Sequence, residues 1–203
     1  MIGVTRTPLR KDAIATRERL VRAALELFTS AGYRGTTTLD LAGRADTAEA
    51  TIYRHFAGKE ALFNEAYRHA LRWGITVIRP TDSQRMPTKE RLGRIARRLV
   101  EQVPKDAPIV LMMLRRPDGP NLEDQTHVLA REVRENLTQL VATGKQEGAI
   151  RPGSAELWGS IWLAVVAFAT ERIAAKEWTA DHPSATATLD AAWDAICSRP
   201  VAG

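Results

Sequence analysis

Five polar side chains of different chemistry lie within one short stretch of this chain, residues 46–63. They are Thr51, Tyr53, Arg54, His55 and Lys59. Groups of these types could surround the substrate of an enzyme as acids, bases and nucleophiles. Hydroxyls and cations also hold the phosphates of DNA, while small residues let a helix come close to the base edges. The elements that carry these residues distinguish between the two uses.

The stretch lies at the end of a predicted bundle of three short helices. Apolar residues recur at helical spacing over residues 11–31, and Gly32 can take the left-handed conformation that ends such a helix. The threonines at 36–38 offer an N-cap to a second helix. A third helix, over residues 47–56, follows a tight turn. The sequence therefore predicts a miniature bundle.

Helical periodicity continues through the rest of the chain, and prolines and glycines interrupt it. Asp106, Ser154 and Ser184 are natural N-caps after these breaks. Strand alternation is nowhere sustained, so we expect an all-α fold, with an N-terminal three-helix bundle followed by a larger helical domain. The helices predicted for the second part span residues 59–78, 88–103, 106–115, 121–146, 154–177 and 184–198.

The composition restricts the class of protein. An apolar content of 44% can bury a core, and the single cysteine, Cys197, excludes an internal disulfide and a multi-cysteine zinc site. We expect no metal and no cofactor. The N-terminus lacks the apolar run of a signal peptide, and the run at 157–169 is too short for a bilayer, which predicts a cytoplasmic protein without a membrane partner. The excess of 29 basic over 24 acidic residues is compatible with a polyanionic partner.

Four short motifs, taken in order, resemble the tetracycline-repressor (TetR) family of bacterial transcription regulators. They are A-A-x-x-L-F at 23–28, G-Y at 32–33, T-T-T-L-D-L-A at 36–42 and T-I-Y-R-H-F-x-x-K-E-x-L at 51–62. Beyond residue 70 the likeness is one of plan only. The resemblance implies a flexible basic tail over residues 1–10, a helix-turn-helix DNA-binding domain over 11–58, and an effector-binding and dimerisation domain over 59–203.

In a helix-turn-helix, the second helix enters the major groove and the first crosses the DNA backbone. The residues expected at the base edges are Ala48, Glu49, Ala50 and Thr51. The other expected DNA-binding residues, mostly phosphate contacts, are Thr37, Thr38, Arg44, Tyr53, Arg54, His55 and Lys59, with Arg6, Arg10 and Lys11 of the tail. Arg54 and His55 could instead be a solvated cation and a structural histidine, Tyr53 could be a core residue, and Phe56 is expected in the core.

Two positions depart from the family pattern. Asp46 stands where the turn usually carries glycine, and aspartate tolerates the left-handed region better than most residues. Glu49 is an acid at a position that should face the groove, where phosphates would repel it. Either Glu49 accepts a hydrogen bond from N4 of a cytosine, or it points away from the DNA.

The helix over residues 154–177 is apolar on every face from 157 to 169, which predicts burial on all sides. One face would pack in its own domain and the other on a partner. By resemblance, this helix and the last one form a four-helix interface in a homodimer, which would bind a palindromic operator in double-stranded DNA. The expected interface residues are Leu157, Ile161, Val165, Leu189, Ala192, Trp193 and Ile196.

The resemblance also implies a cavity for a small-molecule effector, with helix 59–78 as the lever to the DNA-binding domain. The expected lining is Met112, Met113, Leu114, His127, Trp158, Trp162 and Phe168. Methionine and aromatic side chains suit an apolar or aromatic ligand, although at helical spacing they are also ordinary core residues. Repression with release by the ligand is the majority behaviour in the resembled family.

Two other functions stay open at this point. A helical adaptor with a degenerate DNA-binding domain would bind another protein through the apolar 157–169 face. The acid at Glu49 leaves this alternative open. An enzyme would use His127 with Glu123 or Asp124 as acid and base. No nucleophile motif, phosphate-binding loop or metal-ligand set accompanies that pair, so we do not expect an enzyme.

Overall fold

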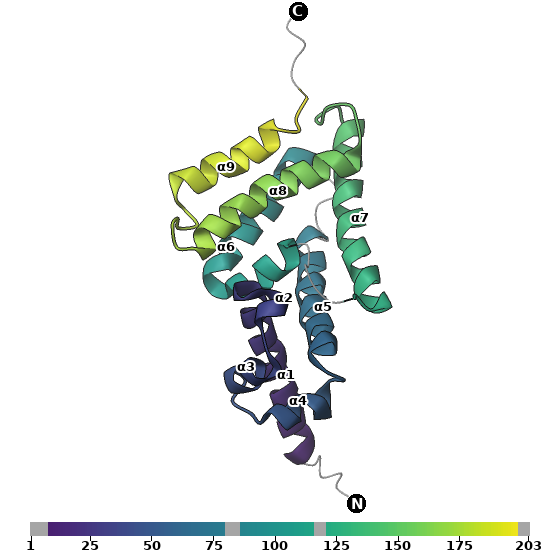
Figure 1. Cartoon of the computed structure of the whole chain (residues 1–203). Coiled ribbons are helices and arrows are strands. Elements are labelled where there is room, and N and C mark those ends of the chain that lie inside the picture. Colours follow the sequence, from purple (N-terminus) through teal and green to yellow (C-terminus); the bar gives the residue numbers. More distant parts are fainter. Residues whose placement is uncertain (1–7, 80–85, 116–120, 199–203) are drawn as a thin grey trace, which may run out of the picture. The chain divides into compact units, whose positions relative to one another are not determined.

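The computed structural model describes residues 8–79, 86–115 and 121–198. Within these ranges the secondary structure is helical, apart from one isolated bridge between Ile150 and Cys197 (Figure 1). The all-α prediction is confirmed. The helices are α1 (Pro8–Ser30), α2 (Gly32–Gly35), α3 (Thr38–Arg44), α4 (Glu49–His55), α5 (Lys59–Ile78), α6 (Thr88–Leu114), α7 (Asp124–Gln146), α8 (Ala155–Ala174) and α9 (Pro183–Asp194).

The described residues form two compact units. The first unit holds residues 8–69 and 121–126, and the second holds 70–79, 86–115 and 127–198. Two helices belong to both units, because α5 passes from one to the other after His69 and α7 does so after Thr126. The first unit therefore ends later in the chain than the predicted boundary at residue 58, and it includes the start of α7.

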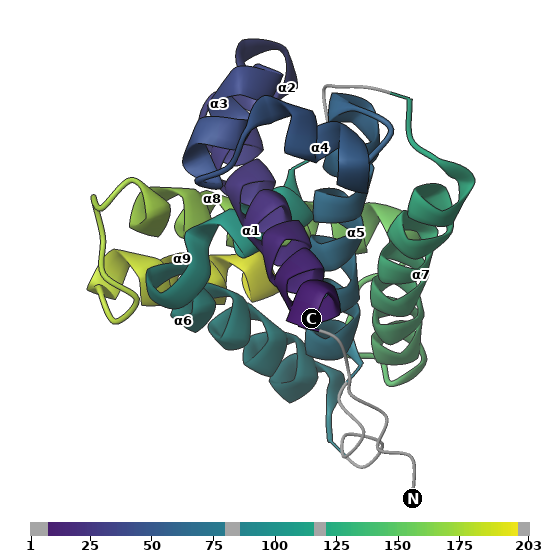
Figure 2. The same cartoon turned by 90° about the horizontal axis from the view of Figure 1, so that it is seen from below.

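In the first unit, α1, α3 and α4 form the expected small bundle (Figures 1 and 2). Fully buried side chains from each helix fill its core, among them Leu20, Leu41 and Ile52. The first helix begins at Pro8, so the last residues assigned to the tail are helical, while Arg6 lies outside the described residues. Gly32 has a φ of 75°, as expected at the end of α1, but one further turn, α2, follows it.

The turn between α3 and α4 has the conformation that the sequence implies. Thr37 is the N-cap of α3, and its side chain and the Asp40 side chain form a capping box. Asp46 takes the left-handed conformation with a φ of 51°. The helix that follows is shorter than predicted, because Ala48 is extended and acts as the N-cap of α4.

In the second unit, α6, α8 and α9 pack against one another. Two separate helices were predicted over 88–103 and 106–115, and the break between them is confirmed: α6 consists of two helical parts that meet at a kink at Asp106, whose backbone is not helical. The side chain of Asp106 caps the second part, since Oδ1 accepts a hydrogen bond from the Ile109 backbone N–H at 3.3 Å. Ser154 caps α8 as predicted, whereas His182 caps α9 in place of Ser184.

The apolar helix α8 is buried on one face only within its own chain. Gly159, Trp162 and Val166 are buried, while Leu157 and Phe168 are 52% and 48% exposed. By length and composition alone, α8 could cross a membrane, contrary to the expectation that its apolar run is too short. The core helix of a soluble protein meets the same two criteria.

Candidate nucleic-acid interface

The helix α4 carries the residues expected to read bases. Ala48, Glu49 and Ala50 are exposed, and Thr51 is half-buried. Ile52 is fully buried and seats the helix on the bundle. Small residues on both sides of an exposed Glu49, with a buried anchor behind them, suit a helix that enters the major groove.

Three polar residues follow along the same helix. Tyr53 and Arg54 are exposed, and His55 is half-buried. Their side chains make no hydrogen bond or ion pair with another residue in the described ranges. Phe56, in contrast, is buried as predicted, and the Arg17 guanidinium lies 5.0 Å from the centre of its ring. The free polar tips of Tyr53, Arg54 and His55 are therefore available to an external partner.

Glu49 has a partner inside the unit that sequence reasoning did not find. Its Oε1 accepts a hydrogen bond from the Thr38 hydroxyl at 2.5 Å. Thr38 lies in the first turn of α3 and Glu49 in the first turn of α4, so the bond joins the two helix starts. The acid thus has a structural role in addition to any contact with a base.

Thr37 is committed to its cap. Its hydroxyl donates to Asp40 Oδ2 at 2.6 Å and accepts from the Asp40 backbone N–H at 3.1 Å, and its own N–H donates to Oδ2 at 2.9 Å. The hydrogen bonds from the Thr37 side chain and backbone hold the pKa of the Asp40 carboxyl below its usual value. The N-terminus of α3, expected to attract a phosphate, already carries this carboxylate.

Lys59 is bound to backbone carbonyls. Its Nζ donates to Thr36 O at 2.9 Å and to Tyr33 O at 3.1 Å, and it lies 4.2 Å from the centre of the Tyr33 ring. Tyr33 and Phe63 pack edge to face at 5.4 Å. Lys59 therefore ties the start of α5 to the turn at α2, a position that a phosphate contact would have to share.

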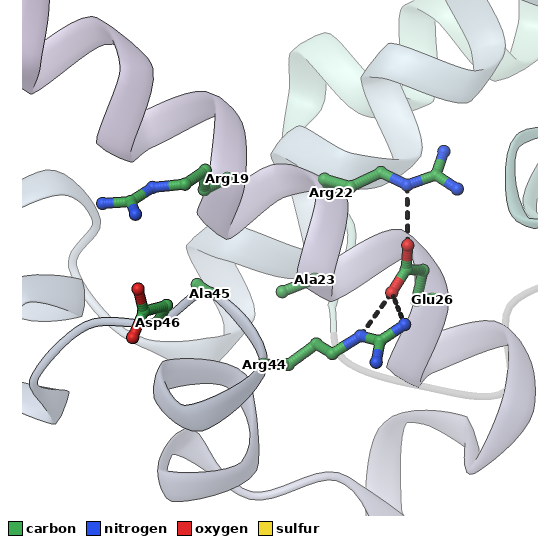
Figure 3. Close-up of a pocket in the computed structure, with 7 residues that line it drawn as sticks. All are labelled: Arg19, Arg22, Ala23, Glu26, Arg44, Ala45 and Asp46. Carbon is green, nitrogen blue, oxygen red and sulfur yellow. Dashed lines mark hydrogen bonds and ion pairs between the residues drawn. The ribbon is translucent and has the colours of Figure 1, made fainter.

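Arg44 is also paired within the unit. Its Nε and Nη2 atoms both lie 2.5 Å from Glu26 Oε2, and Arg22 Nε donates to Oε1 of the same carboxylate at 2.8 Å (Figure 3). Burial raises the pKa of Glu26, but the hydrogen bonds from Arg22 and Arg44 outweigh it and the net pKa is lowered. With Arg19 and Asp46, these residues line an open cleft of about 280 Å³.

A second network holds the start of α7 in the first unit. Arg68 is 7% exposed, and its Nη1 donates to Glu123 Oε2 at 2.6 Å and to the Thr126 hydroxyl at 3.1 Å. Asn64, fully buried, accepts from the Glu123 N–H and donates to Asn121 O. Glu123, one of the two acids considered for an enzyme, thus pairs with Arg68.

The residues expected to line an effector cavity are divided between the core and the surface. Met112, Met113 and Trp162 are buried. His127 is exposed, and the Trp158 indole N–H donates to Pro152 O at 3.1 Å. Phe168 is half-exposed and packs edge to face on Trp178, with ring centres 5.7 Å apart.

Comparison with known proteins agrees with this geometry. A family model described as bacterial regulatory proteins, tetR family, matches residues 20–66, which contain all of α3 and α4. The transcriptional regulator YvkB of Bacillus subtilis is 23% identical over 153 residues, which cover 74% of this chain and 79% of the relative. The transcriptional regulator BetI of Burkholderia lata is 28% identical over 158 residues, covering 72% and 80%.

The fold of the chain is also that of solved regulators. A TetR family transcription regulator from Marinobacter aquaeolei superposes with a TM-score of 0.75 at 18% identity, covering 94% of this chain and all of the other. At this identity the likeness shows the fold, and the family model shows which segment carries the DNA-binding motif. Together they identify the chain as a TetR family DNA-binding transcriptional regulator.

Proposed function

We propose that this regulator is a homodimeric, cytoplasmic repressor that leaves a palindromic operator when a small hydrophobic or aromatic effector binds. The observation that carries the proposal is the order of the exposed residues along α4. Its first turn is small and exposed, and the polar tips that follow it make no bond within the described ranges. Such a helix has one unoccupied surface suited to bases and another suited to phosphates.

In this proposal, the first turn of α4 reads the bases and the residues after it position the protein. Ala48, Ala50 and Thr51 allow close approach, and Glu49 accepts from N4 of a cytosine with the carboxylate oxygen that Thr38 leaves free. Tyr53, Arg54 and His55 contact phosphates. Thr37, Thr38, Arg44 and Lys59 act mainly by holding the helices in place, since each is already bonded within the unit.

The dimer in this proposal forms through the exposed face of α8 together with α9. Leu157, Ile161 and Val165 recur every four residues on this face and are half-buried or exposed in the single chain. Leu189 and Trp193 of α9 keep partly exposed side chains. Ala192 and Ile196 are fully buried in their own chain, so they support the face from behind and the proposed interface does not include them.

The effector in this proposal acts on α5 through its neighbours in the second unit. A Cβ placed on Gly74 of α5 would lie 2.8 Å from Cγ of Met113, so the two helices touch closely at a methionine of the proposed lining. A ligand that displaces Met113 would therefore move this part of α5. The ligand can release DNA only by preferring the displaced state, and a coupling of about 1 to 3 kcal/mol would give roughly 5- to 150-fold release.

The proposal is tested by selecting bound sites from random duplex DNA with the purified full chain. We expect enrichment of a palindrome whose two half-sites are related by the two-fold axis of the dimer. Enrichment of a single, non-repeated half-site would contradict the dimeric mode. No enrichment by a protein that is folded and dimeric would instead favour the adaptor alternative, in which α8 binds another protein.

A further inference from the structure

The first unit exposes one large apolar side chain that the DNA-binding residues named so far do not include. Leu39 is 69% exposed, the highest value among the large exposed apolar residues in the described ranges. Tyr53 and Val128 follow at 59% and 57%. Single exposed leucines are common on protein surfaces, so exposure by itself indicates nothing. The hydrogen bonds of the two residues beside Leu39 add a second observation.

Leu39 lies in the first turn of α3, between two residues that are fixed by hydrogen bonds. On one side, the Thr38 hydroxyl donates to Glu49 at the start of α4. On the other, Asp40 forms the capping box with Thr37. The bonds fix the conformation of this turn and hold it beside the first turn of the reading helix. The exposed leucine therefore belongs to a turn that is fixed by hydrogen bonds and joined to the first turn of the reading helix.

The chemistry of a leucine limits what it can contact there. It has no donor or acceptor for a phosphate or for the polar base edges. The one apolar group that the base pairs present in the major groove is the C5-methyl of thymine. We propose that Leu39 reads a thymine by packing against this methyl group, beside the bases contacted by α4. The inference rests on the DNA-binding mode proposed above and adds a residue of α3 to the reading surface.

The size of the effect follows from the area of one methyl group. Removing one methyl-sized contact from water typically changes affinity roughly three- to fivefold. Leu39→Ala should therefore lower the affinity for the selected operator modestly. The loss should vanish on an operator that lacks the thymine methyl, because the contact is then absent from both complexes.

The test uses the operator recovered by selection with the full chain. Each thymine of one half-site is replaced singly by deoxyuridine, which lacks only the methyl group, and the dissociation constant is measured at fixed salt for the wild type and for Leu39→Ala. Val128→Ala, which truncates another exposed apolar residue, on α7, is the control. Circular dichroism checks that each variant keeps its helices.

We expect one thymine position at which deoxyuridine lowers wild-type and Val128→Ala binding roughly three- to fivefold and leaves Leu39→Ala binding unchanged. Two results would overturn the inference: deoxyuridine costs that are equal in Leu39→Ala and wild type, or no dependence on any thymine methyl. An equal loss of affinity for Leu39→Ala on all duplexes would indicate that Leu39 contacts the DNA backbone, and it would also overturn the inference. If selection recovers no site at all, the proposed function fails, an outcome distinct from these.

Discussion

Among single residues, Glu49 should have the largest effect on sequence preference if it contacts a base as proposed. We predict that Glu49→Ala changes the preferred base pair at one position of each half-site, with a mismatch cost of about 1 to 3 kcal/mol. Tyr53→Ala should weaken binding to all sequences about equally, because phosphate contacts carry no sequence information. Repeating the site selection with each variant measures the difference.

Thr38→Val separates the two roles of Glu49. The variant removes the hydroxyl that donates to Glu49 and keeps a side chain of similar shape. If it changes the preferred base as Glu49→Ala does, Glu49 acts from a position that Thr38 fixes. Equal losses on every sequence for Glu49→Ala would contradict a reading role for this acid.

Lys59 should affect stability before it affects DNA binding. Lys59→Met removes the hydrogen bonds to Tyr33 O and Thr36 O, and a net loss of about 1 to 3 kcal/mol in the free energy of unfolding is expected. Urea unfolding followed by circular dichroism measures it. Arg54→Met, at an exposed position, is the control and should stay within about 0.5 kcal/mol of wild type. Unchanged stability with weaker DNA binding would indicate that Lys59 contacts a phosphate.

Some of these residue roles could be predicted from the sequence and others could not. The burial of Phe56 was predictable from its spacing of four residues from the buried Ile52. The exposure of Tyr53 was not, since its type and position also fit a core residue. The partners of Arg44 and Lys59 lie 18 and 26 residues away in sequence, and no local pattern marks such pairs. The Arg22 and Glu26 pair, four residues apart, was the one signal that could have been found.

At the scale of elements, the start of α7 is fixed to α5 by Arg68. We predict that Arg68→Met destabilises the protein by about 2 to 4 kcal/mol, because it removes the buried cation that Glu65 and Glu123 share and leaves Glu65 with Arg17 alone. Arg79→Met is the matched control, since Arg79 directly after α5 pairs with Glu132 of α7 on the surface, and should cost at most about 1 kcal/mol. Equal costs in urea unfolding would show that burial of Arg68 contributes nothing.

The same network predicts how stability depends on pH. Burial raises the pKa of Glu65, but hydrogen bonds from Arg68 and Arg17 outweigh it, so the folded pKa lies below the ordinary value of 4.5. The stabilisation is complete above pH 4.5 and is lost as the pH falls through the folded pKa. The free energy of unfolding should therefore decrease as the pH is lowered below 4.5. It should decrease less steeply in Glu65→Gln. An identical pH dependence in that variant would contradict this account.

Element boundaries were predictable where a local signal sets them. Thr37, Gly32 and Ser154 begin or end their helices as their chemistry implies. The prediction was wrong at Ser184, because the His182 side chain reaches the Ser184 backbone N–H at 3.1 Å and caps α9 two residues earlier. The unit boundary inside α5 could not be predicted, since Asn64 and Arg68 join it to residues near 121–126 through contacts distant in sequence.

At the scale of the whole molecule, the exposed face of α8 predicts the oligomeric state. Leu157→Glu with Phe168→Glu places charges on this face and should convert a dimer into a monomer, because an isologous interface meets each substitution twice. Sedimentation velocity at micromolar concentration measures the mass. Val128→Glu, an exposed apolar position on α7, should stay dimeric. A monomeric wild type would contradict the proposed dimer, and a double variant that still dimerises would place the interface elsewhere.

Specific DNA binding by the folded chain is the property on which the proposed function depends most directly. The decisive measurement is a titration of wild-type protein against the selected palindrome and a scrambled duplex of equal length, at low and at physiological salt. We predict an affinity ratio of about 10³ or more at physiological salt, and a steep loss of affinity for both duplexes as salt rises. Equal affinity for the two duplexes, or no binding by protein shown to be folded, would contradict it.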